Sequence, residues 1–222
     1  MKDKRPAIVH IVDDDQEVHA AIAELVDSVG LVAQGYASAE RFLSAYDPAI
    51  PGCLVSDVCM PGMGGLQLQQ TLVERGLSIP IIMLTGHADV PMAVEVLSRG
   101  AESFLQKPFR THEFVELIKK AIKKDRENRR REQYRVELAE RFARLTARES
   151  EVVNLVVSGA QNKQIARRLN ISERTVEAHR ARCMEKLAVE SLAQLVAFVL
   201  KYREMHESCD SVCNVDSAGI SP

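Results

Sequence analysis

Residues 53–65, CLVSDVCMPGMGG, place a single carboxylate, Asp57, at the end of an apolar run and just before a proline–glycine turn. The run from Cys53 to Ser56 has the length and composition of a buried strand. An acid in this position is often only a solvated turn residue or a helix cap, and this stretch alone slightly favours that interpretation. The rest of the chain decides whether Asp57 belongs to a site.

On both sides of this stretch, apolar runs alternate with helical patterns. Strands are predicted at residues 7–12, 31–36, 53–57, 80–85 and 103–106, and helices at 16–30, 38–46, 64–76 and 89–100. Five apolar strands that alternate with helices predict an α/β fold, a doubly wound five-stranded parallel sheet with helices on both faces. In such a sheet, the carboxyl ends of the strands converge on one crevice.

Polar side chains stand at these strand ends. In chain order they are Asp13, Asp14, Asp15, Asp57, Thr85 and Lys107. Clustered carboxylates repel one another, and a hard cation with oxygen ligands, such as Mg²⁺, offsets that repulsion. A carboxylate beside such an ion can attack phosphorus, while a lysine and a hydroxyl hold the phosphoryl oxygens. Each residue alone is a weak signal, but the set favours phosphoryl chemistry.

Four segments resemble the receiver domain of two-component response regulators. They are IVDDD (11–15), SDVCMPGMGG (56–65), PIIMLTGH (80–87) and FLQKPF (104–109). The resemblance covers about residues 5–125 and implies a flavodoxin-like receiver fold in which Asp57 is the phosphoacceptor. It also implies that Asp13, Asp14, Asp57 and the backbone carbonyl of Cys59 hold Mg²⁺ or Mn²⁺.

The same resemblance assigns the remaining residues of the pocket. Thr85 and Lys107 would bind the phosphoryl group, and Thr85 and Phe104 would be the switch residues. The other interpretation of Phe104 is a plain core aromatic. Asp15 is interpreted as a solvated acid, not a ligand.

Two other functions are consistent with parts of this pattern. An aspartate-nucleophile phosphohydrolase would place a second acid two residues after the nucleophile, and Cys59 stands at that position. A regulator that binds DNA without phosphate control is the other alternative, and the full set of pocket residues argues against it. We therefore expect a regulator, not an enzyme.

Charge separates the chain into unlike halves. Residues 1–110 contain 8 Lys and Arg against 14 Asp and Glu, whereas residues 111–205 contain 21 against 14. This asymmetry suggests two modules with different partners, the basic one suited to nucleic acid. The run RENRRRE (126–132) is another candidate for DNA binding, but a solvated helix face is the preferred interpretation.

Neither an export signal nor a membrane span is predicted. The apolar run near the N-terminus is too short for either. The five cysteines are odd in number and scattered, which indicates reduced thiols in the cytoplasm. The motif CDSVC (209–213) has a weak metal-site alternative, and a solvated tail is preferred.

The second half reads as helices throughout. A long helix starts at Thr111, with its apolar stripe at Phe114, Leu117, Ile118, Ala121 and Ile122, and four helices are predicted at 145–159, 162–169, 172–187 and 191–202. We expect a receiver domain at 1–122, a helical linker at 123–142, an all-α four-helix helix-turn-helix domain at 143–204 and a disordered tail at 205–222.

The helix at 172–187 has the pattern of a DNA-reading helix. Helical geometry places Val176, Cys183 and Leu187 on one buried face, with polar and small residues opposite. The motif at residues 145–187 resembles the LuxR-type helix-turn-helix of NarL/FixJ response regulators, and its pairing with the receiver segments points to their FixJ-like branch. The whole resemblance extends over about residues 143–203. The expected DNA-contacting residues are Lys163, Arg167, Arg174, Thr175, Glu177, Ala178, Arg180, Ala181 and Arg182.

Together, these features predict a transcriptional regulator that phosphorylation activates. A cognate sensor histidine kinase would phosphorylate Asp57, and the output would be dimerisation or release of the DNA-binding domain. The expected active form is a homodimer on double-stranded promoter DNA. The apolar helix at 191–202 is the expected dimer contact, with core packing as its alternative. RNA polymerase is a further candidate partner, and no membrane partner is expected.

Overall fold

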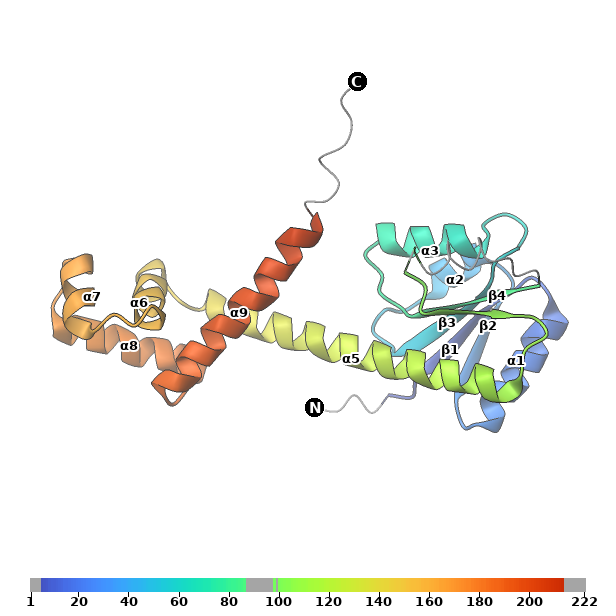
Figure 1. Ribbon diagram of the computed structural model, residues 1–222, viewed down its shortest axis with the longest axis horizontal. Coiled ribbons are helices and arrows are strands. Elements are labelled where there is room, and N and C mark those ends of the chain that lie inside the picture. The colour runs from blue at the N-terminus through green and yellow to red at the C-terminus, as the bar shows by residue number, and fades with distance from the viewer. Residues whose placement is uncertain (1–4, 87–97, 99, 214–222) are drawn as a thin grey trace, which may run out of the picture. The chain divides into compact units, whose positions relative to one another are not determined.

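The structure is a computed structural model that describes residues 5–86, 98 and 100–213 (Figure 1). The chain divides into two compact units, Met1–Arg130 and Arg131–Pro222. The helix predicted at 89–100 lies almost wholly outside the described residues. Within those residues, no helix is long and apolar enough to cross a membrane.

The first unit is built on a five-stranded sheet in the order β2-β1-β3-β4-β5. The strands are β1 (Ile8–Val12), β2 (Val32–Tyr36), β3 (Gly52–Asp57), β4 (Ile81–Thr85) and β5 (Ser103–Gln106). Every neighbouring pair is parallel, so the carboxyl ends of the strands share one edge. The predicted doubly wound parallel sheet is confirmed.

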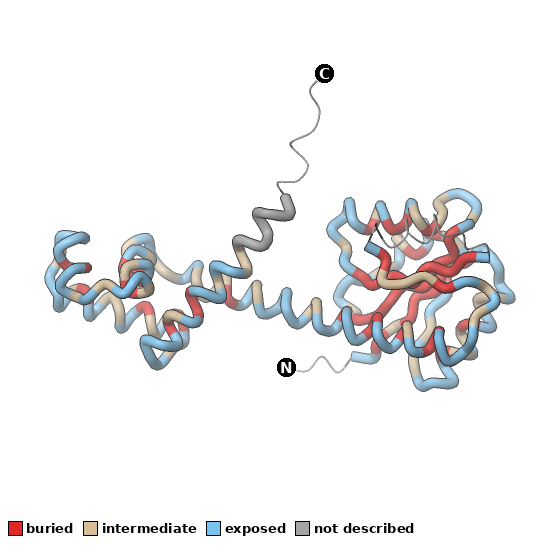
Figure 2. Tube along the Cα trace, in the orientation of Figure 1, coloured by how far each residue is buried: buried red, intermediate tan, exposed pale blue. Residues whose placement is uncertain are grey.

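Helices cover both faces of this sheet. They are α1 (Gln16–Ser28), α2 (Ala39–Ala45), α3 (Gly65–Glu74) and the long α5 (Thr111–Ala143). α1 and α5 pack on one face, and α2 and α3 pack on the other (Figure 1). Figure 2 shows the buried residues concentrated between these layers. β3 is buried at all six positions because both of its faces are covered, which explains its continuous apolar run.

The buried stripe of α5 continues beyond its apolar residues to a charged one. Asp125 is only 1% exposed and accepts hydrogen bonds from the Gly52 N–H at 2.9 Å and from Arg129 Nε at 2.6 Å. Arg129 also donates to the carbonyl of Pro48. This polar clamp holds α5 against the segment in which β3 begins.

The second unit is helical. It contains the end of α5 followed by α6 (Ala147–Val157), α7 (Asn162–Leu169), α8 (Glu173–Leu187) and α9 (Leu192–Cys213). α9 runs past residue 202, where the sequence pattern placed its end, so residues 205–213 of the expected disordered tail are helical. Tyr202 anchors the extension as far as His206, because its ring centroid lies 4.2 Å from that of Phe142 and 4.3 Å from that of His206.

A buried histidine lies in an aromatic cluster between β1 and α2. His10 is 3% exposed, contacts Phe42 and Tyr46, and its Nδ1 lies 3.2 Å from the Tyr36 hydroxyl. Burial lowers the pKa of His10 from 6.5 to about 4, because the apolar surroundings disfavour the imidazolium.

Acidification from pH 6.5 towards pH 4 is therefore expected to destabilise the first unit by about 3 kcal/mol. Over this range His10 takes up a proton in the unfolded chain but stays neutral in the folded one. His10→Phe should make the free energy of unfolding less dependent on pH, as measured by denaturant titration at each pH. His112→Phe, at an exposed position, is the control. This account would be contradicted if the free energy of unfolding of His10→Phe depended on pH as strongly as that of the parent chain.

Candidate functional site

Asp57 lies at the carboxyl end of the central strand β3 and is held there by two donors. Lys107 Nζ lies 2.8 Å from Asp57 Oδ1, and the Cys59 N–H donates to Asp57 Oδ2 at 2.8 Å. The carboxylate side chain is 10% exposed. The strand end thus fixes the carboxylate and still leaves it open to a reactant.

Lys107 joins three strand ends. Besides Asp57, its ammonium contacts Asp13 Oδ2 at 2.7 Å, so the ends of β1, β3 and β5 meet at one cation. Burial by itself would lower the pKa of Lys107, but the hydrogen bonds and charges of Asp13 and Asp57 outweigh it and raise that pKa. Lys107 is therefore positively charged when it faces the carboxylates. The sequence predicted that Asp13, Asp57 and Lys107 converge at one edge of the sheet, and the structure places them there.

Thr85 and Phe104 lie on the neighbouring strands. Thr85 is the last residue of β4, is 4% exposed, and its carbonyl accepts a hydrogen bond from the Lys107 N–H at 2.8 Å. Phe104, on β5, is half-buried and packs against the core on the α2–α3 face. Both residues therefore lie on strands that flank or lead into the pocket.

Gly65 is a site residue that sequence reasoning missed. A Cβ atom at this position would lie 2.4 Å from the Asp57 carbonyl oxygen, closer than any side chain can approach. A residue without a side chain is needed because α3 begins directly against the end of β3. The Gly64–Gly65 pair was the signal that could have revealed this close approach.

The acids near Asp13 have different positions. Asp14 and Asp15 are exposed, and Asp15 caps α1 by accepting from the Glu17 N–H at 2.8 Å. Its N–H also donates to Asp13 Oδ1 at 3.0 Å. Asp15 is thus solvated, as predicted, and it has in addition a capping role that orients the loop around Asp13.

The donors at this edge suit a hard divalent cation. The described residues contain no group of three His, Cys, Asp or Glu side chains arranged to hold a metal. Mg²⁺ does not require one, because it keeps several waters and binds through one or two carboxylates. Asp13 and Asp57 present adjacent carboxylates, and each carboxylate oxygen has a second lone pair beyond its hydrogen bond. The residues therefore fit such an ion.

The second unit presents two helices joined by a tight turn. α7 ends at Asn170, whose φ of 53° is left-handed, and Ser172 caps α8 by accepting from the Thr175 N–H at 3.1 Å. Asparagine tolerates this conformation better than most residues. The predicted turn at 170–172 thus sets the direction in which α8 leaves α7.

α8 has the two faces that helical geometry predicts. Val176, Cys183 and Leu187 are fully buried. The exposed residues among the expected DNA contacts are Lys163, Arg167, Arg174, Glu177, Ala178, Ala181 and Arg182. Thr175 and Arg180 are half-buried and bonded locally, Thr175 to the Ser172 hydroxyl at 2.7 Å and Arg180 to Asn162 Oδ1 at 2.6 Å.

Glu149 connects α6 to α8. Its buried carboxylate accepts from the Thr146 N–H at 2.8 Å, as the predicted capping box requires, and from Lys186 Nζ at 2.6 Å. The Lys186 hydrogen bond, followed by the Thr146 backbone, lowers the pKa of Glu149 to about 2. The contact with Lys186, 37 residues away, lay beyond what local sequence could show.

Glu149→Ala is expected to destabilise the second unit by about 2 kcal/mol, because it removes a cap and leaves the Thr146 N–H unpaired. Hydrogen exchange of the α6 and α8 amides in the full chain would measure this loss. The exposed neighbour Glu151 forms a surface ion pair with Arg148, so Glu151→Ala should cost less than about 1 kcal/mol. Equal effects of the two substitutions would contradict the assigned role.

Comparison with known proteins identifies both units. Residues 9–119 match the response regulator receiver domain, and residues 143–199 match the luxR family of bacterial regulatory proteins. The transcriptional regulatory protein FixJ of Azorhizobium caulinodans is 42% identical over 192 residues, covering 86% of this chain and 91% of that protein. The response regulator protein TodT of Pseudomonas putida is 40% identical over 203 residues, covering 91% and 89%.

Solved structures agree with this result. The response regulator StyR has a TM-score of 0.84 and 40% identity, covering 89% of this chain and all of that chain. Full-length FixJ from B. japonicum has a TM-score of 0.55 and 34% identity, covering 90% and 99%. The chain belongs to the NarL/FixJ family of two-component response regulators, transcriptional regulators that join a receiver domain to a LuxR-type DNA-binding domain.

Proposed function

We propose that Asp57 is the residue through which a sensor histidine kinase controls DNA binding by this chain. The observation that carries the proposal is the Lys107 ammonium, which holds Asp57 and Asp13 together at the ends of three parallel strands. An Asp57 oxygen would attack the phosphorus of a phosphohistidine. The P–N bond would break, and an acyl phosphate would form on Asp57.

The other pocket residues have matching roles in this proposal. Asp13, Asp14, Asp57 and the Cys59 carbonyl would hold Mg²⁺ or Mn²⁺, which supplies charge neutralisation for phosphoryl transfer. Lys107 and the Thr85 hydroxyl would bind phosphoryl oxygens. A phosphoryl oxygen on Asp57 would compete with Asp57 Oδ1 for the Lys107 ammonium, so phosphorylation would disturb the contact between β3 and β5. Thr85 and Phe104 would convey the change along β4 and β5.

In the second unit, α8 would read the major groove of promoter DNA. Arg174, Glu177 and Arg182 are exposed on the face opposite the buried stripe, with the small residues Ala178 and Ala181 between them. Lys163, Arg167, Thr175 and Arg180 would contact phosphates. The family's LuxR-type domain and the exposed polar face of α8 support this part of the proposal.

The proposal also assigns domain boundaries along the chain. Residues 1–122 would be the receiver, 123–142 the linker, 143–204 the DNA-binding domain and 205–222 the tail, with the helical residues to Cys213 extending the third of these. The protein would work in the cytoplasm, with a histidine kinase and promoter DNA as partners and RNA polymerase as a further candidate.

Dimerisation through α9 would accompany phosphorylation. Leu195, Phe198 and Val199 are buried in the core of the unit, whereas Leu192 and Leu200 are each 49% exposed on the same helix. Core packing accounts for the buried residues of this helix, and the proposal assigns the exposed Leu192 and Leu200 to a partner contact. Two such helices would pair the reader helices on adjacent half-sites.

Light scattering in Mg²⁺, with and without beryllium fluoride as a phosphoryl mimic, tests this step. The chain should change from monomer to dimer, and Leu200→Glu should prevent the change. Val73→Glu is the matched control, because Val73 is a 63% exposed apolar residue on α3 and outside α9. A dimer that forms equally well in Leu200→Glu would rule out the α9 contact.

A further inference from the structure

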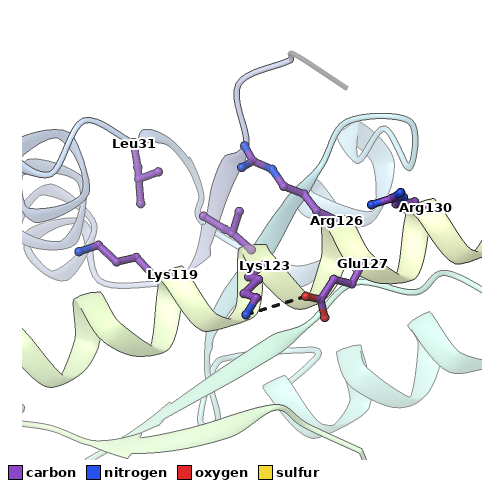
Figure 3. Close-up of a pocket in the computed structure, with 7 residues that line it drawn as sticks. Leu31, Lys119, Lys123, Arg126, Glu127 and Arg130 are labelled. Carbon is purple, nitrogen blue, oxygen red and sulfur yellow. Dashed lines mark ion pairs between the residues drawn. The ribbon is translucent and has the colours of Figure 1, made fainter. Parts of the chain in front are cut away.

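A groove on the first unit is lined by basic side chains that the assignments above leave unused. It has a volume of about 380 Å³ and lies between α5 and Leu31, which follows α1 (Figure 3). Leu31 and Ile122 contribute apolar atoms to it. The basic side chains, hereafter the basic stripe, are Lys119, Lys123, Arg126 and Arg130.

The positive charge of the basic stripe is largely unneutralised. Two acids lie beside it: Glu116 Oε1 is 3.9 Å from Lys119 Nζ, and Glu127 Oε1 is 4.0 Å from Lys123 Nζ. All four side chains are mostly exposed. Exposed ion pairs of this kind have small interaction energies, so they neutralise the basic stripe only weakly. The described residues supply no ion pair to Arg126 or Arg130.

Three cations on other faces of the same helix are paired with acids that are buried or half-buried. Lys120 and Lys124 both contact the half-buried Glu102, and Arg129 is bound by the buried Asp125. These three cations serve the fold. Those of the basic stripe have at most an exposed acid beside them and remain available to an external anion.

The spacing of the basic stripe suits a linear polyanion. Residues separated by four, three and four positions project from one side of a helix, and the set spans about 16 Å along the α5 axis. A DNA strand carries one phosphate per about 3.4 Å of duplex axis, so several phosphates fall within that length. Arginine also matches phosphate geometry through two parallel hydrogen bonds.

The chain length between the stripe and the DNA-binding region permits simultaneous contact. The luxR-type match starts at residue 143, and twelve residues separate it from Arg130. These residues belong to α5, and a helical segment of this length spans about 18 Å. Duplex DNA beside the site read by α8 is therefore within reach of the stripe.

We propose that the basic stripe of α5 binds the phosphate backbone of duplex DNA next to the site read by α8. The contact is electrostatic and independent of sequence, so it adds affinity and leaves the choice of promoter to α8. This inference rests on the DNA-binding role of α8, and it assigns to the receiver end of the chain a direct part in holding DNA.

The test compares Arg126→Gln/Arg130→Gln with Lys120→Gln/Lys124→Gln, in the full-length chain on a long mixed-sequence duplex. Both double variants lose the same charge from the same helix, but only the first removes stripe residues. Binding by fluorescence anisotropy over a range of salt concentrations gives the slope of log affinity against log salt. The stripe variant should bind more weakly at low salt, with a slope shallower by about one unit for each lost phosphate contact.

The control variant should keep the slope of the parent chain. Equal slopes for the parent and the stripe variant would overturn the proposal, as would equal losses in the stripe and control variants. Phosphoryl incorporation at Asp57 verifies that each variant is folded. Arg174→Ala on α8 separates the two proposals, because failure of the reader role would leave sequence preference unchanged in Arg174→Ala while the stripe slope still responds.

Discussion

Asp57→Asn is expected to abolish phosphoryl incorporation into this chain. The carboxamide keeps the size of the side chain and can still accept a hydrogen bond from Lys107, so the pocket should remain folded. It has no anionic oxygen with which to attack phosphorus, and the acyl phosphate cannot form. The measurement is intact mass after incubation with Mg²⁺ and a small phosphoryl donor such as acetyl phosphate.

Asp15→Asn is the matched control for this experiment. Asp15 is an acid two residues from Asp13, but it is exposed and caps α1. An asparagine preserves that cap, so the control should incorporate one phosphoryl group as the parent chain does. Full incorporation in Asp57→Asn would show that another residue is the acceptor.

Asp125→Ala is expected to produce a large loss of stability, about 3 kcal/mol. Breaking a buried pair by removing one partner leaves the other without compensation. Here the Gly52 N–H loses its acceptor and the Arg129 guanidinium loses its carboxylate. Because β3 begins at Gly52, hydrogen exchange of the β3 amides in the full chain is the direct measurement.

Two companion substitutions check the cause of that loss. Asp125→Asn retains an acceptor for Gly52 and should cost about 1.5 kcal/mol, the lower end for a single hydrogen bond to a charged group. Glu127→Ala, on the same helix, removes an acid that is 62% exposed, and it should cost less than about 0.5 kcal/mol. If Glu127→Ala lost as much stability as Asp125→Ala, the cause would be the charge of the helix and not the contacts of Asp125 with Gly52 and Arg129.

The sheet and its pocket could be predicted because their signals are local. Apolar runs of five or six residues that end in Asp13, Asp57 and Thr85 mark both the strands and the edge at which they converge. Parallel pairing then follows from the helices between the strands. The buried face of α8 could be predicted for the same reason, because Val176, Cys183 and Leu187 follow helical periodicity.

Residues whose roles depend on distant partners could not be predicted in this way. Asp125 lies in a run of charges, and only its contact with Gly52, 73 residues away, shows that it is buried. Helix α9 continues past residue 202, where Tyr202 stacks on Phe142 of α5, a contact that local composition does not encode. Local pattern fixes the periodicity of an element, whereas its end depends on what it packs against.

The central claim is that phosphorylation at Asp57 controls DNA binding. The most direct test is the affinity of the chain for DNA with and without a phosphoryl mimic. The full-length chain, in Mg²⁺, is titrated onto a duplex that the chain itself has selected from a random pool, with and without beryllium fluoride. The account predicts at least about fivefold tighter binding with the mimic, the lower end of common coupling between two sites, and no change in Asp57→Ala. Equal affinity in both conditions would contradict it and identify a regulator that binds DNA without phosphate control.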